Sequence, residues 1–276
     1  MKIVLPSLVL FSFLVYVFPV VKDLFISSSN IKKLQWKEIF NLSELNKDYV
    51  AQGIAYHNNL IFFTVHEKDK RSYILIFEEK NNTLYNLKQF VMPKEATHTS
   101  DLTFYKGSLY AVDYEATKIY KIDILKSISV DNLIVEDSVD INKKRTGSLE
   151  IIEYMGKEYL FITSFLYDNN LYVYDFNKFM NKEVDEPEIE IKNSYFVQGL
   201  YFDSIDNVLY QSVNKKGVDA IYKIDIEKLF ITKKLADSII ETYNVPIDMV
   251  EDIFVRDGII YASQEKSNKI YKADIK

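Results

Sequence analysis

Short apolar segments recur along the chain at a nearly constant interval. Each opens with small or polar residues followed by a branched apolar residue, and the five copies occupy residues 52–56, 100–104, 147–151, 198–202 and 251–255. Their aligned apolar residues are 48, 47, 51 and 53 positions apart: Ile54, Leu102, Leu149, Leu200 and Ile253. Self-similarity at this period predicts an array of similar structural units.

Three further strand-like segments follow each of these openings. A second apolar segment comes after a short turn, as in residues 60–63 and 109–112. The third is the most regular and reads Ile-Tyr-Lys-Ile-Asp-Ile in both 119–124 and 221–226. A weaker fourth segment, such as 84–87, completes the unit. Four strands that recur at about 40–50 residues are typical of the blades of a β-propeller.

The two ends of the repeat region indicate how the ring closes. The fifth repeat contains only three of its four strands, whereas residues 34–40 are strand-like and belong to no repeat. We therefore predict an all-β fold, a five-bladed β-propeller of four-stranded antiparallel blades in residues 34–276. The N-terminal strand would complete the last blade and remove its open edge. A six-bladed ring is the alternative.

Residues 3–21 contain no charged side chain. This length is close to the ~20 residues that cross a bilayer as a helix, whereas a cleavable signal peptide has a shorter apolar region and a small-residue cleavage site. We favour an uncleaved signal-anchor over a cleaved signal, with residues 1–33 as the anchor or signal segment plus a linker. The propeller is then expected outside the cytoplasm, anchored in the membrane through residues 3–21, or secreted if the segment is cleaved.

The amino-acid composition excludes several kinds of functional site and partner. The chain has no cysteine, which excludes disulfides, thiolate metal sites and a cysteine nucleophile, and its three histidines exclude a histidine-rich metal centre. The net charge is −6, and because residues 1–33 carry four lysines and one aspartate, residues 34–276 hold −9. An acidic domain repels phosphate backbones, so we expect no nucleic-acid partner.

The repeats should gather polar residues around the mouth of the central channel. In a propeller, the loops that lead into first strands and those that join second to third strands lie at one face, here called the top face, where ligands are expected. The ligand-binding candidates are Gln52, Asp101, Arg145, Glu150, Gln198, Glu251 and Asp252. Four of these are carboxylates that would suit an oxygen-ligated metal, with Ca²⁺ as the candidate ion: Asp101, Glu150, Glu251 and Asp252. The alternative is that each polar side chain caps its own turn or bonds exposed backbone at a strand edge.

His98 lies three residues before Asp101, and such a pair can form a base with its orienting carboxylate. The catalytic candidates are therefore His98, Asp101 and Glu150. Four aspartates recur too regularly to form one site and are expected to bond the turn after each third strand: Asp123, Asp175, Asp225 and Asp274. Gly53 and Gly199 are expected to allow a tight turn before the first strand.

One blade resembles a known family. Residues 196–200 read Phe-Val-Gln-Gly-Leu and, with 208–212 and 220–225, are similar to the F-x-Q-G-L … L-Y-x-S … I-x-x-I-D blade of plant-type glutaminyl cyclotransferases. Residues 147–150 with 154–157 are similar to their N-E-L-E … N-G segment. The resemblance covers about two blades and extends to extracytoplasmic propellers with NHL and lactonase-like members. It implies a propeller fold and either cyclotransferase-like acyl chemistry or hydrolysis assisted by a divalent metal at the channel mouth.

Two functions follow as predictions. The first is an exported, membrane-tethered propeller that binds a small ligand, a peptide or a partner protein at the top face. The second is an enzyme, either a metal-assisted hydrolase or a glutaminyl-cyclotransferase-like enzyme that uses the ring of carboxylates.

Overall fold

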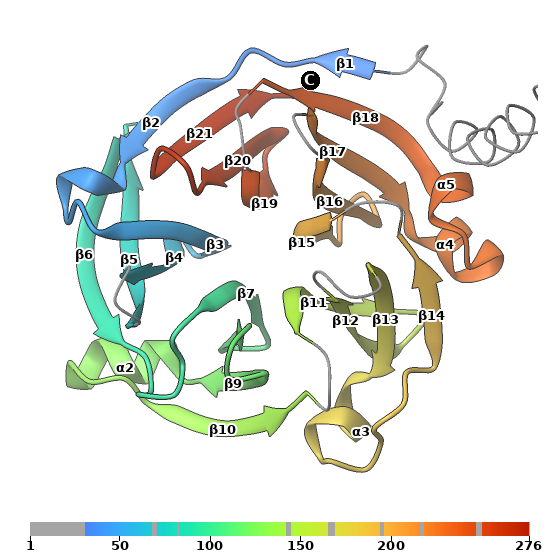
Figure 1. Cartoon of the computed structure of the whole chain (residues 1–276), viewed down its shortest axis with the longest axis horizontal. Helices are drawn as coiled ribbons and strands as arrows, with labels where there is room; N and C mark the ends of the chain where they lie inside the picture. Colours follow the sequence, from blue (N-terminus) through green and yellow to red (C-terminus); the bar gives the residue numbers. More distant parts are fainter. Residues whose placement is uncertain are drawn as a thin grey trace, which may run out of the picture. The chain divides into compact units, whose positions relative to one another are not determined.

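Five antiparallel sheets are arranged around a common axis, so the predicted five-bladed β-propeller is confirmed (Figure 1). The structure is a computed structural model, and it describes residues 31–67, 71–81, 83–141, 145–164, 169–193, 196–215, 218–246 and 250–275. The charge-free stretch 3–21 lies outside these residues. Within them, no helix has both the length and the apolar character to span a membrane.

Each blade contains four consecutive antiparallel strands, counted from the axis outward, and only the fifth takes its outer strand from the N-terminal side of the ring. The first blade contains β3 (Tyr49–His57), β4 (Leu60–Glu67), β5 (Ser72–Lys80) and β6 (Thr83–Val91). The second contains β7 (Thr99–Tyr105), β8 (Ser108–Asp113), β9 (Lys118–Ile122) and β10 (Val135–Asp140). The third contains β11 (Thr146–Tyr154), β12 (Lys157–Ser164), β13 (Asn170–Asp175) and β14 (Ile189–Lys192). The fourth contains β15 (Phe196–Asp203), β16 (Val208–Lys215), β17 (Val218–Asp225) and β18 (Ile239–Val245). The fifth contains β19 (Val250–Arg256), β20 (Ile259–Gln264), β21 (Lys269–Asp274) and the N-terminal β2 (Lys37–Asn41).

The ring closes as predicted, because β2 pairs antiparallel with β21 and places Asn41 opposite Lys269. The segment before it has a structural role too. The sequence analysis placed residues 31–33 in the linker, but they form β1 (Ile31–Lys33), a fifth strand at the outer edge of the fourth blade beside β18. Lys32 forms an ion pair of 2.8 Å with Glu241 of β18.

Helical turns follow the third strands of three blades. They are α2 (Ile124–Val130), α3 (Phe176–Met180) and α4 (Ile226–Thr232), and the short α5 (Leu235–Ser238) and η2 (Leu42–Glu44) lie in other connections. The side chains of Asp123, Asp175 and Asp225 cap the first three helices by accepting a hydrogen bond from a backbone N–H three residues later. Three of the four recurrent aspartates therefore bond the turn after the third strand, as expected.

The apolar core lies between blades. One cluster joins Phe63 and Phe77 of the first blade to Phe254 and Tyr261 of the fifth, and similar clusters join the first to the second, the second to the third and the fourth to the fifth. Both faces of each sheet are therefore covered, which explains why many strands read as continuous apolar runs rather than alternating ones.

All five innermost strands carry a register shift near their start. The shifts fall between Ala51 and Ile54, Thr99 and Asp101, Thr146 and Ser148, Val197 and Gly199, and Val250 and Ile253. A bulge places extra residues opposite the partner strand and redirects their side chains. The recurrent opening pattern of the sequence is therefore the signature of a bulge at the top of the channel.

Candidate functional site

The bulges build a pocket at the mouth of the channel. One residue from each innermost strand lines it, and these are the equivalent residues Gln52, Ser100, Gly147, Gln198 and Glu251. Three further side chains come from or border the top-face loops, namely His98, Tyr114 and Glu265. The cavity measures about 150 Å³, which suits a small molecule or the end of a chain.

The predicted ring of carboxylates is divided between the pocket and the interior. Only Glu251 lines the pocket. Asp101 and Asp252 each follow the pocket-lining residue of their own strand by one position, and Glu150 follows Gly147 by three. All three side chains are almost completely buried. The four groups therefore do not meet at one point, because successive residues of a strand point in different directions.

Asp101 and Asp252 connect neighbouring blades. Asp101 accepts the backbone N–H of Leu149 in the third blade at 2.9 Å, and Asp252 accepts that of Ile54 in the first blade at 2.7 Å. The two carboxyl groups also hydrogen-bond each other, which requires that one is protonated. Burial raises the pKa of both, to about 8 for Asp252 and well above the ordinary range for Asp101, where the neighbouring Asp252 adds to the effect.

Two glycines make room for these aspartates. A Cβ atom at Gly199 would lie 2.0 Å from Asp252 Oδ1, and one at Gly53 would lie 2.7 Å from the Asp101 Cα. Neither glycine has a positive φ angle, unlike Gly107 at +86°. The expectation that these glycines allow a tight turn is therefore wrong, and they are required because the next blade's aspartate occupies the space of a side chain.

Glu150 has the same bridging role between the third and fourth blades. One carboxylate oxygen accepts hydrogen bonds from the Thr103 hydroxyl at 2.6 Å and the Ile151 N–H at 2.8 Å, and the other accepts the Phe202 N–H at 3.0 Å. Burial raises its pKa to about 7 in spite of these donors. Because its oxygens are used by backbone and hydroxyl donors, Glu150 supports the ring rather than the pocket.

Glu251 is the carboxyl group with access to the pocket. Gln198 donates its amide N–H groups to both Glu251 oxygens at 3.2 and 3.3 Å. The carboxyl also hydrogen-bonds that of Glu265, and burial together with this neighbour raises the pKa of Glu251 well above its ordinary range. A carboxyl group with a raised pKa beside a second carboxyl can donate or accept a proton.

His98 lies on the opposite wall and contacts Gln52 rather than Asp101. Its Nε2 is 3.0 Å from the Gln52 side-chain oxygen, and its ring stacks beside His66 with centroids 4.5 Å apart. Burial and the proximity of His66 lower the pKa of His98 to about 4, so the ring is neutral at physiological pH. The structure thus places His98 and Gln52 together in the pocket, and Asp101 beneath it.

Arg145 reaches the edge of this site. Its guanidinium donates to the Tyr114 hydroxyl at 3.0 Å and lies over the Tyr114 ring, with its Cζ atom 5.0 Å from the ring centroid. Sequence reasoning missed Tyr114, although it directly follows β8 in a loop between a second and a third strand. That position in the repeat is the signal that would have found it.

The described residues contain no group of three or more His, Asp or Glu side chains placed to hold a metal ion. The Ca²⁺ hypothesis, built on Asp101, Glu150, Glu251 and Asp252, stays a prediction.

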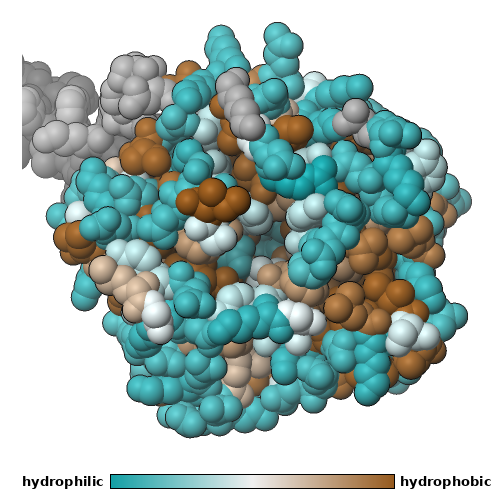
Figure 2. All heavy atoms as spheres, turned by 180° about the vertical axis from the view of Figure 1, so that it is seen from behind, coloured by the Kyte–Doolittle hydropathy of each residue, from teal (hydrophilic) through white to brown (hydrophobic). Residues whose placement is uncertain are grey.

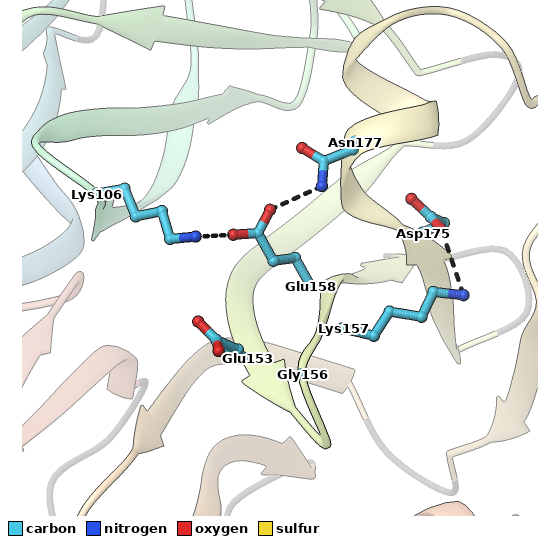
Figure 3. A pocket seen from close by; sticks show the side chains of 7 residues that line it. All are labelled: Lys106, Glu153, Gly156, Lys157, Glu158, Asp175 and Asn177. Atoms are coloured by element: carbon cyan, nitrogen blue, oxygen red, sulfur yellow. Dashed lines mark hydrogen bonds and ion pairs between the residues drawn. The ribbon is translucent and has the colours of Figure 1, made fainter.

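A larger cavity of about 370 Å³ lies between the second and third blades, near the hairpins opposite the top face (Figure 3). Its charged groups are largely paired with one another: Glu158 bonds Lys106 and accepts the Asn177 amide N–H at 2.8 Å, and Lys157 is 3.3 Å from Asp175. These contacts occupy most of the charged groups that line this cavity.

No family model matches the sequence, and no curated protein matches it. The fold is similar to the crystal structure of Myxococcus xanthus glutaminyl cyclase, with a TM-score of 0.60, 8% identity, and coverage of 88% of this chain and 97% of that one. It is more distantly similar to a chain of the mitotic checkpoint complex, with a TM-score of 0.49, 7% identity and coverage of 82% and 75%. U3-55K gives a TM-score of 0.46, 8% identity and coverage of 80% and 79%. At 8% identity, the likeness to the Myxococcus structure shows the fold alone.

Proposed function

We propose that this protein binds a small polar molecule carrying an amine in the top-face pocket. The observation that carries the proposal is the Glu251–Glu265 carboxyl pair, which has access to the cavity while no lysine or arginine is among the described residues that line it. An ammonium group would replace the proton that the pair holds and satisfy both carboxylates. The net charge of −9 on residues 34–276 favours approach of a cation as well.

Thermal unfolding with matched probes tests this proposal. Glycinamide carries an ammonium group, whereas N-acetylglycinamide has the same amide without the charge. We expect glycinamide, but not N-acetylglycinamide, to raise the melting temperature. At a hundredfold excess over Kd, binding should add about 2.7 kcal/mol to the free energy of unfolding. Glu251→Gln should remove the effect, while Glu153→Gln in the opposite cavity should keep it. An equal shift in Glu251→Gln, or none in the wild type, would contradict the proposal.

A second candidate function is glutaminyl-cyclase-like catalysis at the same pocket. The likeness to the Myxococcus glutaminyl cyclase spans most of both chains, and the Glu251–Glu265 pair supplies a group that can give up and recover a proton. Closing a terminal glutamine on its own amine needs such a group, because the departing nitrogen must be protonated to leave as ammonia. Release of ammonia from a glutamine-terminal peptide, lost in Glu251→Gln and kept in Glu153→Gln, would support it.

We also propose that the propeller is exported and tethered to the membrane through residues 3–21, on the strength of their charge-free composition. A reporter fused after Lys276 should then be active only outside the cytoplasm, with the chain in the membrane fraction. A soluble secreted product that starts near residue 30 would instead indicate a cleaved signal.

A further inference from the structure

We propose that Gln52 holds His98 in one neutral tautomer, with its hydrogen on Nε2, so that the bare Nδ1 accepts a hydrogen bond from a ligand in the pocket. This inference rests on the proposed ligand-binding function and adds a requirement to it. Besides its amine, the ligand should present a second N–H or O–H donor on the His98 side of the cavity.

The orientation of the Gln52 amide follows from its two contacts. Its Nε2 is 2.8 Å from the carbonyl oxygen of Ala51, which can only accept a hydrogen bond. The Gln52 oxygen is therefore the atom that faces His98, and since an amide oxygen also only accepts, the His98 Nε2 at 3.0 Å must donate. Only 2% of the surface of Gln52 is exposed, so both contacts are shielded from solvent.

The surroundings of His98 keep the ring neutral. His66 from β4 lies against it, and the Nδ1 of His66 must donate to the Glu67 carbonyl oxygen at 3.2 Å, so protonation of both rings would bring two positive charges together. The Tyr114 ring is 5.4 Å away, and the Asp113 carboxylate accepts the backbone N–H of His98 at 2.8 Å. Burial and His66 lower the His98 pKa to about 4, in agreement with this arrangement.

A neutral imidazole with its hydrogen on Nε2 has a lone pair on Nδ1. Within the described part of the chain, the His98 Nδ1 makes no hydrogen bond, and His98 lines the cavity. The buried Nε2 of His66 likewise has no partner there. The His98 Nδ1 is therefore an acceptor without a donor at the cavity wall, which points to a ligand that donates.

Nitrogen NMR of the full chain tests the tautomer directly, because the protein has only three histidines, His57, His66 and His98. The variants His57→Gln and His98→Gln assign the signals. We expect His98 to show a protonated Nε2, a bare Nδ1 and no titration between pH 5.5 and 8. In Gln52→Glu, the carboxylate should favour the imidazolium, so the His98 pKa rises into that range, whereas Gln198→Glu on the other wall should leave the tautomer unchanged. A wild-type His98 with its hydrogen on Nδ1, or one that titrates near 6.5, would overturn the proposal.

Glycinamide, which carries both kinds of donor, tests the contact with the ligand. We expect it to shift the His98 Nδ1 signal, and Gln52→Leu to weaken its binding about fivefold, the loss of roughly one neutral hydrogen bond. Binding with an unmoved Nδ1 signal would overturn the contact. A complete lack of binding would instead count against the proposed function of the pocket, and the tautomer of the free protein is measured independently of it.

Discussion

Two neighbouring carboxyl groups, those of Glu251 and Asp252, have different roles because they lie at a bulge and point in different directions. Glu251 lies at the bulge and reaches the pocket, whereas its neighbour Asp252 points inward and bonds the backbone of Ile54. The two carboxyl groups therefore have different neighbours. Glu251 has a second carboxyl and an amide as neighbours, while Asp252 is enclosed by backbone donors and Asp101.

Binding of an amine at Glu251 should depend on pH. Burial and Glu265 raise the pKa of the Glu251 carboxyl, so it holds a proton that an incoming ammonium must displace. We expect affinity for glycinamide to increase as the pH rises, by up to about tenfold per pH unit below that pKa, with release of a proton on binding. Calorimetry in buffers of different ionisation enthalpy measures this release. Affinity that is constant between pH 5 and 8 would argue against Glu251 as the partner.

Gly199→Ala should destabilise the protein more than an ordinary glycine substitution. The added Cβ would lie 2.6 Å from the Asp252 Cα and closer still to its carboxylate, so β15 and β19 would have to separate. We expect a loss of about 3 kcal/mol in the free energy of unfolding. Gly107→Ala is the control, because an added Cβ there meets no atom and the only penalty comes from the positive φ angle. We expect it to cost about 1 kcal/mol. Denaturant unfolding of both variants decides, and equal costs would contradict the steric explanation.

The repeating element is a blade whose connections have distinct signatures. Four of the five hairpins between first and second strands have two residues with positive φ angles, as at Lys106–Gly107 and Asp257–Gly258. Such turns suit the twist of paired strands and favour glycine or asparagine. In the second, third and fourth blades, the third strand leads into an aspartate that starts a helical turn. The fifth blade differs because its outer strand comes from the other end of the ring.

Truncations distinguish the roles of β1 and β2. Removal of residues 1–33 takes away β1 and the Lys32–Glu241 ion pair but leaves the closing strand, so the domain should fold with a small loss of stability. Removal of residues 1–42 also deletes β2, exposes the edge of β21 and uncovers Phe77, against whose ring Phe40 packs with centroids 5.0 Å apart. Circular dichroism melts of the two proteins should therefore differ strongly, and similar melting would show that closure by β2 is not required.

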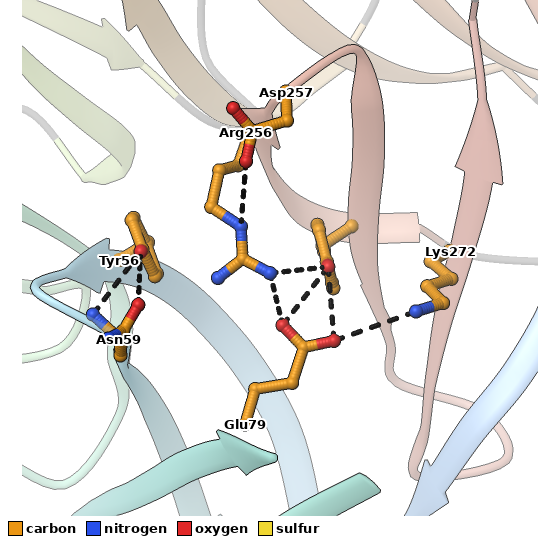
Figure 4. Close-up of polar contacts among 7 residues, drawn as sticks. Tyr56, Asn59, Glu79, Arg256, Asp257 and Lys272 are labelled. Carbon is orange, nitrogen blue, oxygen red and sulfur yellow. Dashed lines mark hydrogen bonds and ion pairs between the residues drawn. The ribbon is translucent and has the colours of Figure 1, made fainter. Parts of the chain in front are cut away.

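In the whole molecule, the ring is held by contacts between blades at two radii. Near the axis, Asp101, Glu150 and Asp252 bridge the innermost strands. Further out, Glu79 of the first blade bonds Arg256, the Tyr261 hydroxyl at 3.1 Å and Lys272 at 3.5 Å, all from the fifth blade (Figure 4). This second set ties together the two blades at which the ring closes.

The outer surface contributes less to this organisation. Hydrophilic side chains cover most of the face seen in Figure 2, with apolar side chains gathered toward one part of it. The exposed large apolar residues of the described chain include Tyr85, Leu87 and Val91, which alternate on the outermost strand β6 of the first blade. The alternation leaves one side of this strand in solvent while Leu84 and Phe90 pack inward.

The buried carboxyls should make the stability of the whole ring decrease at alkaline pH. The folded-state pKa values of Glu150 and Asp252 are raised to about 7 and about 8, so the folded protein binds more protons than the unfolded chain until these groups ionise. Their stabilisation is complete below the unfolded values and is lost as the pH rises through 7 and 8. The pKa of His98 is lowered to about 4, so this residue makes stability increase with pH, but only below about pH 6.5.

Between pH 6.5 and 8 we therefore expect the free energy of unfolding to fall. The decrease is at most about 1.4 kcal/mol per pH unit for each proton that the folded protein binds in excess of the unfolded chain. Denaturant titrations at several pH values measure the slope, and Asp252→Asn should flatten it. If that variant does not fold, the wild-type curve alone is informative, because stability that is constant or rising over this range would contradict the protonated core.

The sequence by itself determined the period, the strands, the number of blades and the closing strand, because each depends on local patterns of apolar and turn-forming residues that repeat. It also placed the polar ring at the channel mouth, since equivalent positions of equivalent blades must lie at the same height. Only the tertiary structure decided which ring residues face the pocket. A bulge sends Glu251 and Gln52 into the pocket and turns Asp101 and Asp252 inward, and its register depends on the paired strand. The role of Gly199 was equally inaccessible, because the atom that excludes a side chain there belongs to another blade, 53 residues away.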